Sequence, residues 1–246
     1  MKQIDAGRVR AVFRKELRDY RRKRSIVVTM IFLPFPFLIE PIIAFFLVPG
    51  PANISSAKSY VVFPLLYLLL IPSIMPSLLA SYTILGEREQ GTLEPLLTTP
   101  IREQELIAGK AIAVIAPTMI ISYAVYGLIL AAVALFAKPI IRSAVFHQGP
   151  ILLSLILLAP LLAGWSTAVG MVISVRATDV RVAQQLASFA SFPPVIVILL
   201  LAVGVIHPTL SVALIFAAAL FLIDARAVRI VSRMMNRERL ITGSKP

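Results

Sequence analysis

Residues 87–100 form a polar segment within a chain that is otherwise largely apolar. The segment reads E-R-E-Q-G-T-L-E-P-L-L-T-T-P, and its charged side chains belong to Glu87, Arg88, Glu89 and Glu94. An ionised side chain in a bilayer core costs several kcal/mol unless it is paired or reaches water. We therefore expect the segment to lie in water between two membrane-buried segments. There Glu87 and Glu89 can form ion pairs with basic residues of a partner protein or of the N-terminal segment.

Three leucines of this segment share one helical face. Leu93, Leu96 and Leu97 are spaced i, i+3 and i+4, Thr92 can act as an N-cap, and Pro95 is tolerated in a first helical turn. The pattern predicts a short amphipathic helix. A leucine face on the water side of a membrane protein usually contacts a partner. The alternative is that it packs on the chain's own bundle or on the lipid interface.

A second helix is expected to follow directly. Thr99 is a candidate N-cap with Pro100 at the first helical position. Glu103 and Glu105 lie near the positive end of the dipole of this second helix, where acids are favourable. We expect this helix to lead into the third membrane span.

Side chains for covalent or metal chemistry are few. The sequence contains no cysteine, and His147 and His207 cannot complete a zinc site by themselves. A P-loop needs G-x-x-x-x-G-K-[ST], and Gly109-Lys110 lacks both the first glycine and the hydroxyl residue of that motif. An intramembrane enzyme would need a nucleophile with a base, but residues 164–168 lack the second glycine of a nucleophile elbow. We therefore expect no catalytic residue, no metal and no cofactor bound by this chain.

The composition is that of a membrane protein. Of the 246 residues, 59% are hydrophobic and 15% charged, and the mean hydropathy is +0.90, whereas soluble domains average roughly 45–50% apolar and about 25% charged residues. A membrane-spanning helix needs about 20 predominantly apolar residues. Six stretches meet this length. The first is interrupted by Glu40, and the last two are separated at Gly204–Pro208. The fold class expected is therefore an all-α polytopic membrane protein. The spans are residues 25–57, 59–86, 111–137, 148–175 and, as a pair, 182–223.

The distribution of positive charge predicts the orientation of these spans. Of the 24 Lys and Arg residues, 21 fall in the two termini and in the loops after the second and fourth spans, and only Lys58, Lys138 and Arg142 fall in the opposite loops. Cytoplasmic loops carry the excess of Lys and Arg in membrane proteins. The net charge of +12 therefore indicates a topology with both termini and residues 87–100 in the cytoplasm, rather than nucleic-acid binding.

Polar segments flank the spans within what we expect to be one transmembrane domain, residues 1–246. Residues 1–24 have apolar side chains at helical spacing among many basic ones, which predicts an amphipathic helix in the plane of the lipid headgroups. A basic leader that only sets the topology is the alternative. Residues 25–225 would form the six-helix bundle, and residues 226–246 a basic cytoplasmic tail.

A few polar side chains within the spans are candidates for a transport pathway. Glu40 is an acid inside the first span, so it is expected to contact a substrate or a partner helix, or else to reach the interface. Ser77, Tyr82 and Tyr123 have hydroxyl groups that could line a pathway, although such groups also serve helix packing in membranes.

The polar segment resembles the cytoplasmic signature of the type-2 family of ABC transporter permeases. The resemblance continues through Glu105, Leu106 and Gly109-Lys110 and returns in the second cytoplasmic loop near Pro193, and it covers most of the chain. The matching residues of the first motif are Glu87, Arg88, Glu89, Gly91, Thr92, Leu93, Glu94, Leu96, Leu97, Thr99 and Pro100. Those of the second loop are Arg181, Ala183, Gln184 and Gln185, and Asp179 is a further candidate site residue of that loop.

This resemblance implies the permease subunit of an ATP-driven exporter in a prokaryotic cytoplasmic membrane. Such a subunit pairs with a second permease chain, identical or different, and docks on two copies of a P-loop ATPase, which bind the ATP and magnesium. Residues 87–100 would be the coupling helix region that contacts the ATPase. The family name leaves the cargo open, and an apolar pathway with a few hydroxyls would suit a hydrophobic or amphipathic small molecule. The competing reading is an ion-coupled secondary transporter that uses Glu40.

Overall fold

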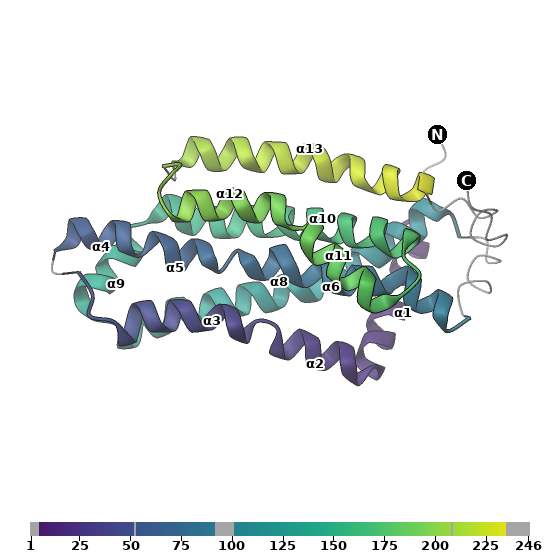
Figure 1. The fold of residues 1–246 in the computed structure, drawn as a ribbon, viewed down its shortest axis with the longest axis horizontal. Coiled ribbons are helices and arrows are strands. Elements are labelled where there is room, and N and C mark those ends of the chain that lie inside the picture. Colours follow the sequence, from purple (N-terminus) through teal and green to yellow (C-terminus); the bar gives the residue numbers. More distant parts are fainter. Residues whose placement is uncertain (1–4, 52, 92–100, 208, 235–246) are drawn as a thin grey trace.

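The computed structural model describes residues 5–51, 53–91, 101–207 and 209–234, and every regular element in these ranges is a helix (Figure 1). Six helical segments are long and apolar enough to cross a membrane, as expected from the sequence. They are Ile26–Leu47, Ser56–Glu89, Glu103–Phe136, Gly149–Arg176, Val180–Ala202 and Leu210–Val231.

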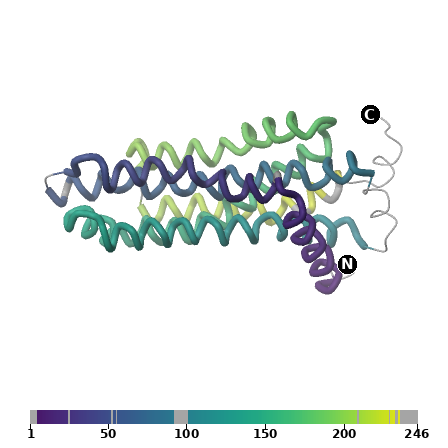
Figure 2. Tube along the Cα trace, turned by 90° about the horizontal axis from the view of Figure 1, so that it is seen from below, coloured from purple at the N-terminus to yellow at the C-terminus, as the bar shows by residue number. Residues whose placement is uncertain are grey.

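The helices run largely parallel to one long axis, except for the first (Figures 1 and 2). In chain order they are α1 (Ala6–Arg22), α2 (Arg24–Phe32), α3 (Phe35–Ile42), the π-helical η1 (Ile43–Leu47), α4 (Ile54–Tyr60), α5 (Val62–Tyr67), α6 (Leu70–Glu89), α8 (Glu103–Phe136), α9 (Pro139–Phe146), α10 (Gly149–Arg176), α11 (Val180–Ala190), α12 (Phe192–Ala202) and α13 (Leu210–Met234).

The first span is shorter and more broken than the sequence indicated. It ends at Leu47 rather than near residue 57, and it consists of α2, α3 and η1. Pro34 lies between α2 and α3, where its missing N–H and its ring interrupt the helical ladder. Pro41 lies inside α3, just before the wider turns of η1, and a π-helical segment is one way in which a helix accommodates such a defect.

Helices α6 and α10 form the centre of the bundle. A Cβ atom on Gly170 of α10 would lie 2.7 Å from the carbonyl oxygen of Ser77, so the glycine lets the two backbones approach closely. Two serines of α10 add hydrogen bonds across this contact: the Ser166 hydroxyl donates to the Ser73 carbonyl, and Ser174 Oγ accepts from the backbone N–H of Leu85 at 3.0 Å. Small residues and buried hydroxyls thus take the place of a hydrophobic driving force, which is weak between helices in lipid.

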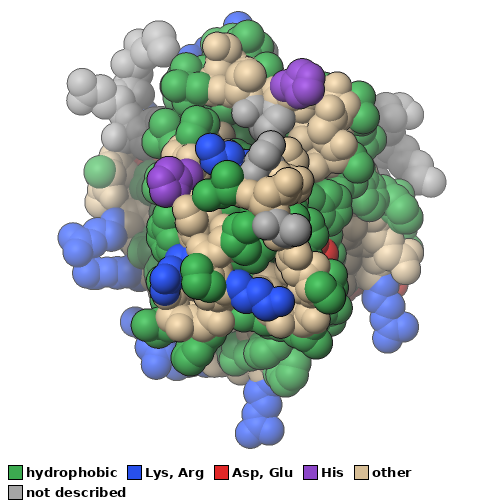
Figure 3. Space-filling view, turned by 90° about the vertical axis from the view of Figure 1, so that its left-hand side faces the viewer, with side chains coloured by type: hydrophobic (Ala, Val, Ile, Leu, Met, Phe, Trp, Pro, Cys, Tyr) green, Lys and Arg blue, Asp and Glu red, His purple; other side chains and the backbone are tan. Residues whose placement is uncertain are grey.

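The two ends of the bundle differ in architecture and charge. At one end, here the α1 end, α1 lies across the bundle (Figures 1 and 2), and α13 ends there as well (Figure 1). At the other, the α9 end, α4 packs against α9. Figure 3 looks onto this end, where hydrophobic side chains surround a few basic ones. Lys58 belongs to α4, Arg142 to α9, and Lys138 is the N-cap of α9.

Candidate functional site

Helix α1 crosses the start of α8 with one buried face. Asp5 caps α1 by accepting a 2.8 Å hydrogen bond from the backbone N–H of Gly7, and Val12, Glu16 and Tyr20 are buried at four-residue intervals. A Cβ atom on Gly109 of α8 would lie 2.6 Å from the Cβ of Val12, so the crossing requires a glycine. The predicted amphipathic helix is therefore present, and its buried face includes an acid.

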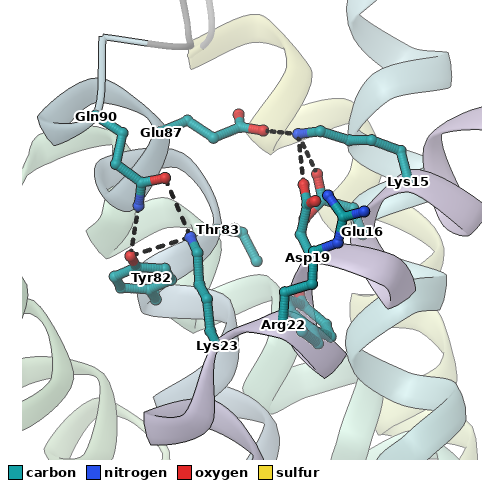
Figure 4. A pocket seen from close by; sticks show the side chains of 10 residues that line it. Lys15, Glu16, Asp19, Arg22, Lys23, Tyr82, Thr83, Glu87 and Gln90 are labelled. Carbon is teal, nitrogen blue, oxygen red and sulfur yellow. Dashed lines mark hydrogen bonds and ion pairs between the residues drawn. The ribbon is translucent and has the colours of Figure 1, made fainter.

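That acid belongs to a group of charges, here called the charge cluster, formed by the buried Glu16, Glu87 and Lys110 and the partly exposed Lys15. The Lys110 side chain is fully buried, and its Nζ lies 2.9 Å from Glu16 Oε1, 2.9 Å from Glu87 Oε2 and 3.0 Å from the Thr83 carbonyl oxygen. Lys15 Nζ lies 2.5 Å from Glu87 Oε1 and 3.2 Å from Glu16 Oε1 (Figure 4). The cluster joins α1, the end of α6 and the start of α8.

The charge cluster contains two lysines and two glutamates, so its formal charges cancel, and the opposite charges stabilise one another. Burial by itself raises the pKa of Glu16, but the ammonium groups of Lys110 and Lys15 bring this pKa below its ordinary value. Burial by itself lowers the pKa of Lys15, but the carboxylates of Glu16 and Glu87 raise this pKa above its ordinary value. Glu16 and Lys15 are therefore charged near neutral pH, and removal of the Lys110 ammonium would deprive the buried Glu16 carboxylate of one of its partners.

A second set of contacts joins the end of α1 to the end of α6. Lys23 Nζ lies 3.2 Å from the Tyr82 hydroxyl, 4.7 Å from the centre of the Tyr82 ring and 3.3 Å from Gln90 Oε1. Gln90 Nε2 donates to the same hydroxyl at 2.7 Å. These residues line a polar pocket of about 270 Å³ together with Lys15, Glu16 and Glu87 of the charge cluster (Figure 4). The prediction that Glu87 pairs with a basic residue of the N-terminal segment agrees with this geometry.

The start of α8 is also tied to α1, through Glu105. Its carboxylate accepts hydrogen bonds of 3.0 Å from the backbone N–H groups of Asp5 and Arg102, and it lies 3.5 Å from Arg8 Nη1. The helix begins at Glu103 with Arg102 as its N-cap. The prediction that the helix leading into the third span starts at residue 100 was therefore wrong, because the cap is formed by Glu105 reaching back to Arg102 N–H.

The loop after α10 contacts the end of α6. Asp179 caps α11 by accepting hydrogen bonds from the backbone N–H groups of Arg181, at 2.7 Å, and Val182. Arg88 donates a hydrogen bond to the carbonyl of Ala177, which links the two loops. Gln184 lines a pocket of about 230 Å³ with Tyr82 of α6, whereas the Arg181 and Gln185 side chains are exposed.

The described part of the first motif ends at Gly91. Glu89 is exposed at the end of α6, and Gly91 has φ +66°, a conformation that suits glycine. The remaining motif residues lie outside the described residues, so their contacts with a partner stay predictions. They are Thr92, Leu93, Glu94, Leu96, Leu97, Thr99 and Pro100.

The four candidate pathway residues do not meet in one cavity. Ser77 is fully buried in the contact between α6 and α10, and its hydroxyl donates to the Ile74 carbonyl at 2.7 Å. Tyr82 lies in the pocket beside the charge cluster. Tyr123 donates to the Ile156 carbonyl at 2.9 Å. Glu40 lines a separate cavity of about 670 Å³.

Sequence inspection missed Glu16, Lys110 and Asp224. Glu16 lies four residues after Val12 and four residues before Tyr20. This spacing places an acid on the apolar face of a basic helix, a signal that could have been recognised in the sequence. The last span was expected to end at residue 223, but it runs to Val231 and so includes a second acid within a span, Asp224. Asp224 is partly buried against Gly164 of α10, where a Cβ atom would lie 2.4 Å from Asp224 Oδ2.

The comparison with known families agrees with this architecture. A family model described as ABC-2 family transporter protein matches residues 10–238, which includes most of α1 and all six spans. Among curated proteins, no significant match to the chain was found. The chain therefore belongs to the ABC-2 family of transporter proteins, as a multi-pass membrane component of an ABC transporter.

Proposed function

We propose that this chain is the permease subunit of an ATP-driven exporter and that the α1 end receives the force of ATP hydrolysis from separate ATPase subunits. The observation that carries this proposal is the charge cluster. It joins Glu87, in the last turn of α6, to Lys15 of α1, and Lys110, in the helix after the 87–100 segment, to Glu16 of the same helix α1. A loop anchored on both sides can pass a displacement to α6 and α8 together instead of absorbing it.

The proposed orientation has the α1 end in the cytoplasm of a prokaryotic cell, with both termini and the 87–100 loop on that side. It is supported by the 21 Lys and Arg residues of the termini and of the loops after the second and fourth spans, against three at the α9 end. The cysteine-free sequence allows a direct test with single cysteines at Ser56, Thr98, Ser143 and Thr178. Thiol reagent applied to intact cells should label Ser56→Cys and Ser143→Cys, and labelling of the other two would overturn the orientation.

The proposed assembly contains two copies of a P-loop ATPase, which hold the ATP and magnesium, and a second permease chain. Residues 1–246 act as one transmembrane domain, in which residues 1–24 form the interfacial helix, 25–225 the bundle and 226–246 the cytoplasmic tail. This chain itself would bind no cofactor or metal and no nucleic acid. Co-purification in mild detergent with candidate P-loop ATPase subunits should recover a complex, and recovery of the permease alone under all such conditions would contradict the proposal.

Coupling is tested by the leucine face of the 87–100 loop. Burying one leucine is worth roughly 1.5–3 kcal/mol, so Leu96→Asp should remove a contact with the ATPase and place a charge there. Transport-linked ATP hydrolysis of the reconstituted complex should fall, while Ser143→Asp at the α9 end should leave it unchanged. Equal activity of the two variants would refute the coupling role. If Leu96→Asp instead lowers only the yield and thermal stability of the permease, the face packs on the chain's own bundle.

A further inference from the structure

A cavity of about 670 Å³ opens near the α9 end, whereas the charge cluster lies at the α1 end. Its walls come from the first two spans and from the end of α12. The volume falls within the roughly 300–1,000 Å³ of sites that bind drug-sized molecules. Glu40 is seven residues before the end of its span at Leu47, or roughly 10 Å from that end at 1.5 Å per residue. The cavity therefore lies within the apolar part of the bundle.

The cavity contains one acid and several aromatic rings. Glu40 of α3 lines it together with Tyr60 of α4 and Phe63 and Tyr67 of α5. The Phe63 and Tyr67 rings are stacked, with centroids 5.9 Å apart and planes at 27°. Most of the other side chains in its walls are apolar, Ile39 among them, so the acid faces a poorly hydrated space.

The carboxylate of Glu40 lacks the partner that a buried charge needs. Its Oε2 atom is buried and accepts no hydrogen bond from any residue in the described ranges. The Tyr60 hydroxyl in the cavity wall is engaged elsewhere, since it donates its proton to the Ala44 carbonyl at 2.8 Å. An acid left in this state is costly unless something else in the cavity compensates its charge.

We infer that this cavity binds an organic cation, an ammonium group on an apolar body, through Glu40 and the neighbouring aromatic rings. A carboxylate compensates a positive charge, and the faces of aromatic rings attract cations within about 6 Å. A bare metal ion does not fit, because calcium and magnesium require several oxygen ligands and the described residues contain no group of three metal-binding side chains. An anionic ligand would be repelled by Glu40. This inference rests on the proposed export function, for which it names the class of cargo.

The test measures binding of ethidium, a permanently charged aromatic cation, to the full-length chain in lipid nanodiscs made of phosphatidylglycerol. Fluorescence anisotropy should give an affinity at least tenfold weaker for Glu40→Gln than for the unaltered chain, with partial recovery in Glu40→Asp. Neutral N-phenyl-1-naphthylamine should bind equally to all three. The matched control is Asp224→Asn, which neutralises another acid inside a span but outside this cavity, and it should retain ethidium binding. Equal ethidium affinity in Glu40→Gln and the unaltered chain would overturn the inference.

The source of the ammonium group is distinguished by a second set of nanodiscs that contain phosphatidylethanolamine. If a lipid headgroup occupies the cavity, ethidium should bind the unaltered chain more weakly in these discs, and the difference should vanish in Glu40→Gln. If the occupant is cargo, the affinity should be the same in both lipids. Both results support an ammonium site.

Folding and the export proposal are tested separately from binding. Because the Glu40 carboxylate has no hydrogen-bond partner at Oε2, Glu40→Gln should not lower the melting temperature. A lower melting temperature would mean that the acid is structural, which contradicts a ligand site. Binding requires no ATPase, so a chain that binds ethidium but fails to associate with any ATPase would overturn only the proposed function.

Discussion

Replacing Lys110 with methionine should release α1 from the bundle. The change keeps an unbranched side chain of similar length but removes the ammonium that contacts Glu16, Glu87 and the Thr83 carbonyl. Both carboxylates would then depend on Lys15, whose side chain is 42% exposed and therefore screened by water. Removing one partner of a buried ion pair costs about 3–5 kcal/mol. Since about 1.4 kcal/mol is a tenfold change in an equilibrium, the open population of α1 should rise on the order of 10²–10³-fold.

The opening can be measured by thiol labelling, because the chain has no cysteine of its own. Val12 lies on the buried face of α1 and is 4% exposed, so a Val12→Cys reporter should react slowly in the closed state and in proportion to the open population. A second reporter, Ser122→Cys, replaces a fully buried hydroxyl in α8 with a thiol of similar size. Lys110→Met should accelerate labelling at the first reporter and leave the second protected, which separates release of α1 from unfolding of the bundle.

The reasoning also predicts a rescue. In the Lys110→Met background, Glu87→Gln restores the charge balance of the cluster, so labelling of Val12→Cys should return at least halfway toward the original rate on a logarithmic scale. Lys58→Met, at an exposed position of the α9 end, is the control and should have no effect. If Lys110→Met labels no more than threefold faster than Lys58→Met, the charge cluster does not hold α1 in place.

Three further outcomes are expected. Gly109→Ala should weaken the packing of α1 on α8 by about 1–3 kcal/mol through overpacking, because the new Cβ would lie 2.6 Å from the Cβ of Val12. Trypsin should then cleave α1 faster in membranes. An unchanged cleavage rate would contradict the tight crossing. Gly164→Ala should cost less, under about 1 kcal/mol, because the nearest atoms belong to the Asp224 side chain, which can rotate away; a melting temperature lowered by more than about 4 °C would exceed this. The pKa of Glu16 is lowered in the folded chain, so Glu16 adds to the free energy of unfolding. This contribution is fully present at a pH above the ordinary glutamate pKa of about 4.3, and it is lost as the pH falls through the pKa of the folded state. The melting temperature should therefore decline with acid below about pH 4, and a decline just as steep in Glu16→Gln would assign it to other groups.

The number and approximate position of the spans could be predicted because length and hydrophobicity determine them. The fourth span was expected at residues 148–175 and is found at Gly149–Arg176. The turn before the sixth span was expected at Gly204, which adopts φ +79°. Both features depend on residues close together in the sequence, where hydropathy and glycine preference are sufficient.

The charge cluster could not be predicted in full, because its partners are distant in the sequence. Lys110 was noted as part of a Gly-Lys pair, but whether a lysine at the start of a span reaches water or a carboxylate depends on where α1 crosses α8. The break at Pro34 was also missed. A hydropathy window registers an apolar proline as part of a continuous span, whereas the backbone loses a hydrogen-bond donor at that position.

The separation of these partners along the chain affects how the protein is synthesised. Lys110 lies 94 residues after Glu16, and at about 5–20 residues per second a ribosome needs roughly 5–20 s to translate that stretch. For most of this interval α1 is already made while Glu87 is not, and the lysine is added only at the end. The first helix to be translated therefore reaches its final position only after the second span and the beginning of the third have been made. Until then we expect its arginines and lysines to face water and acidic headgroups, because a basic amphipathic helix binds at that interface.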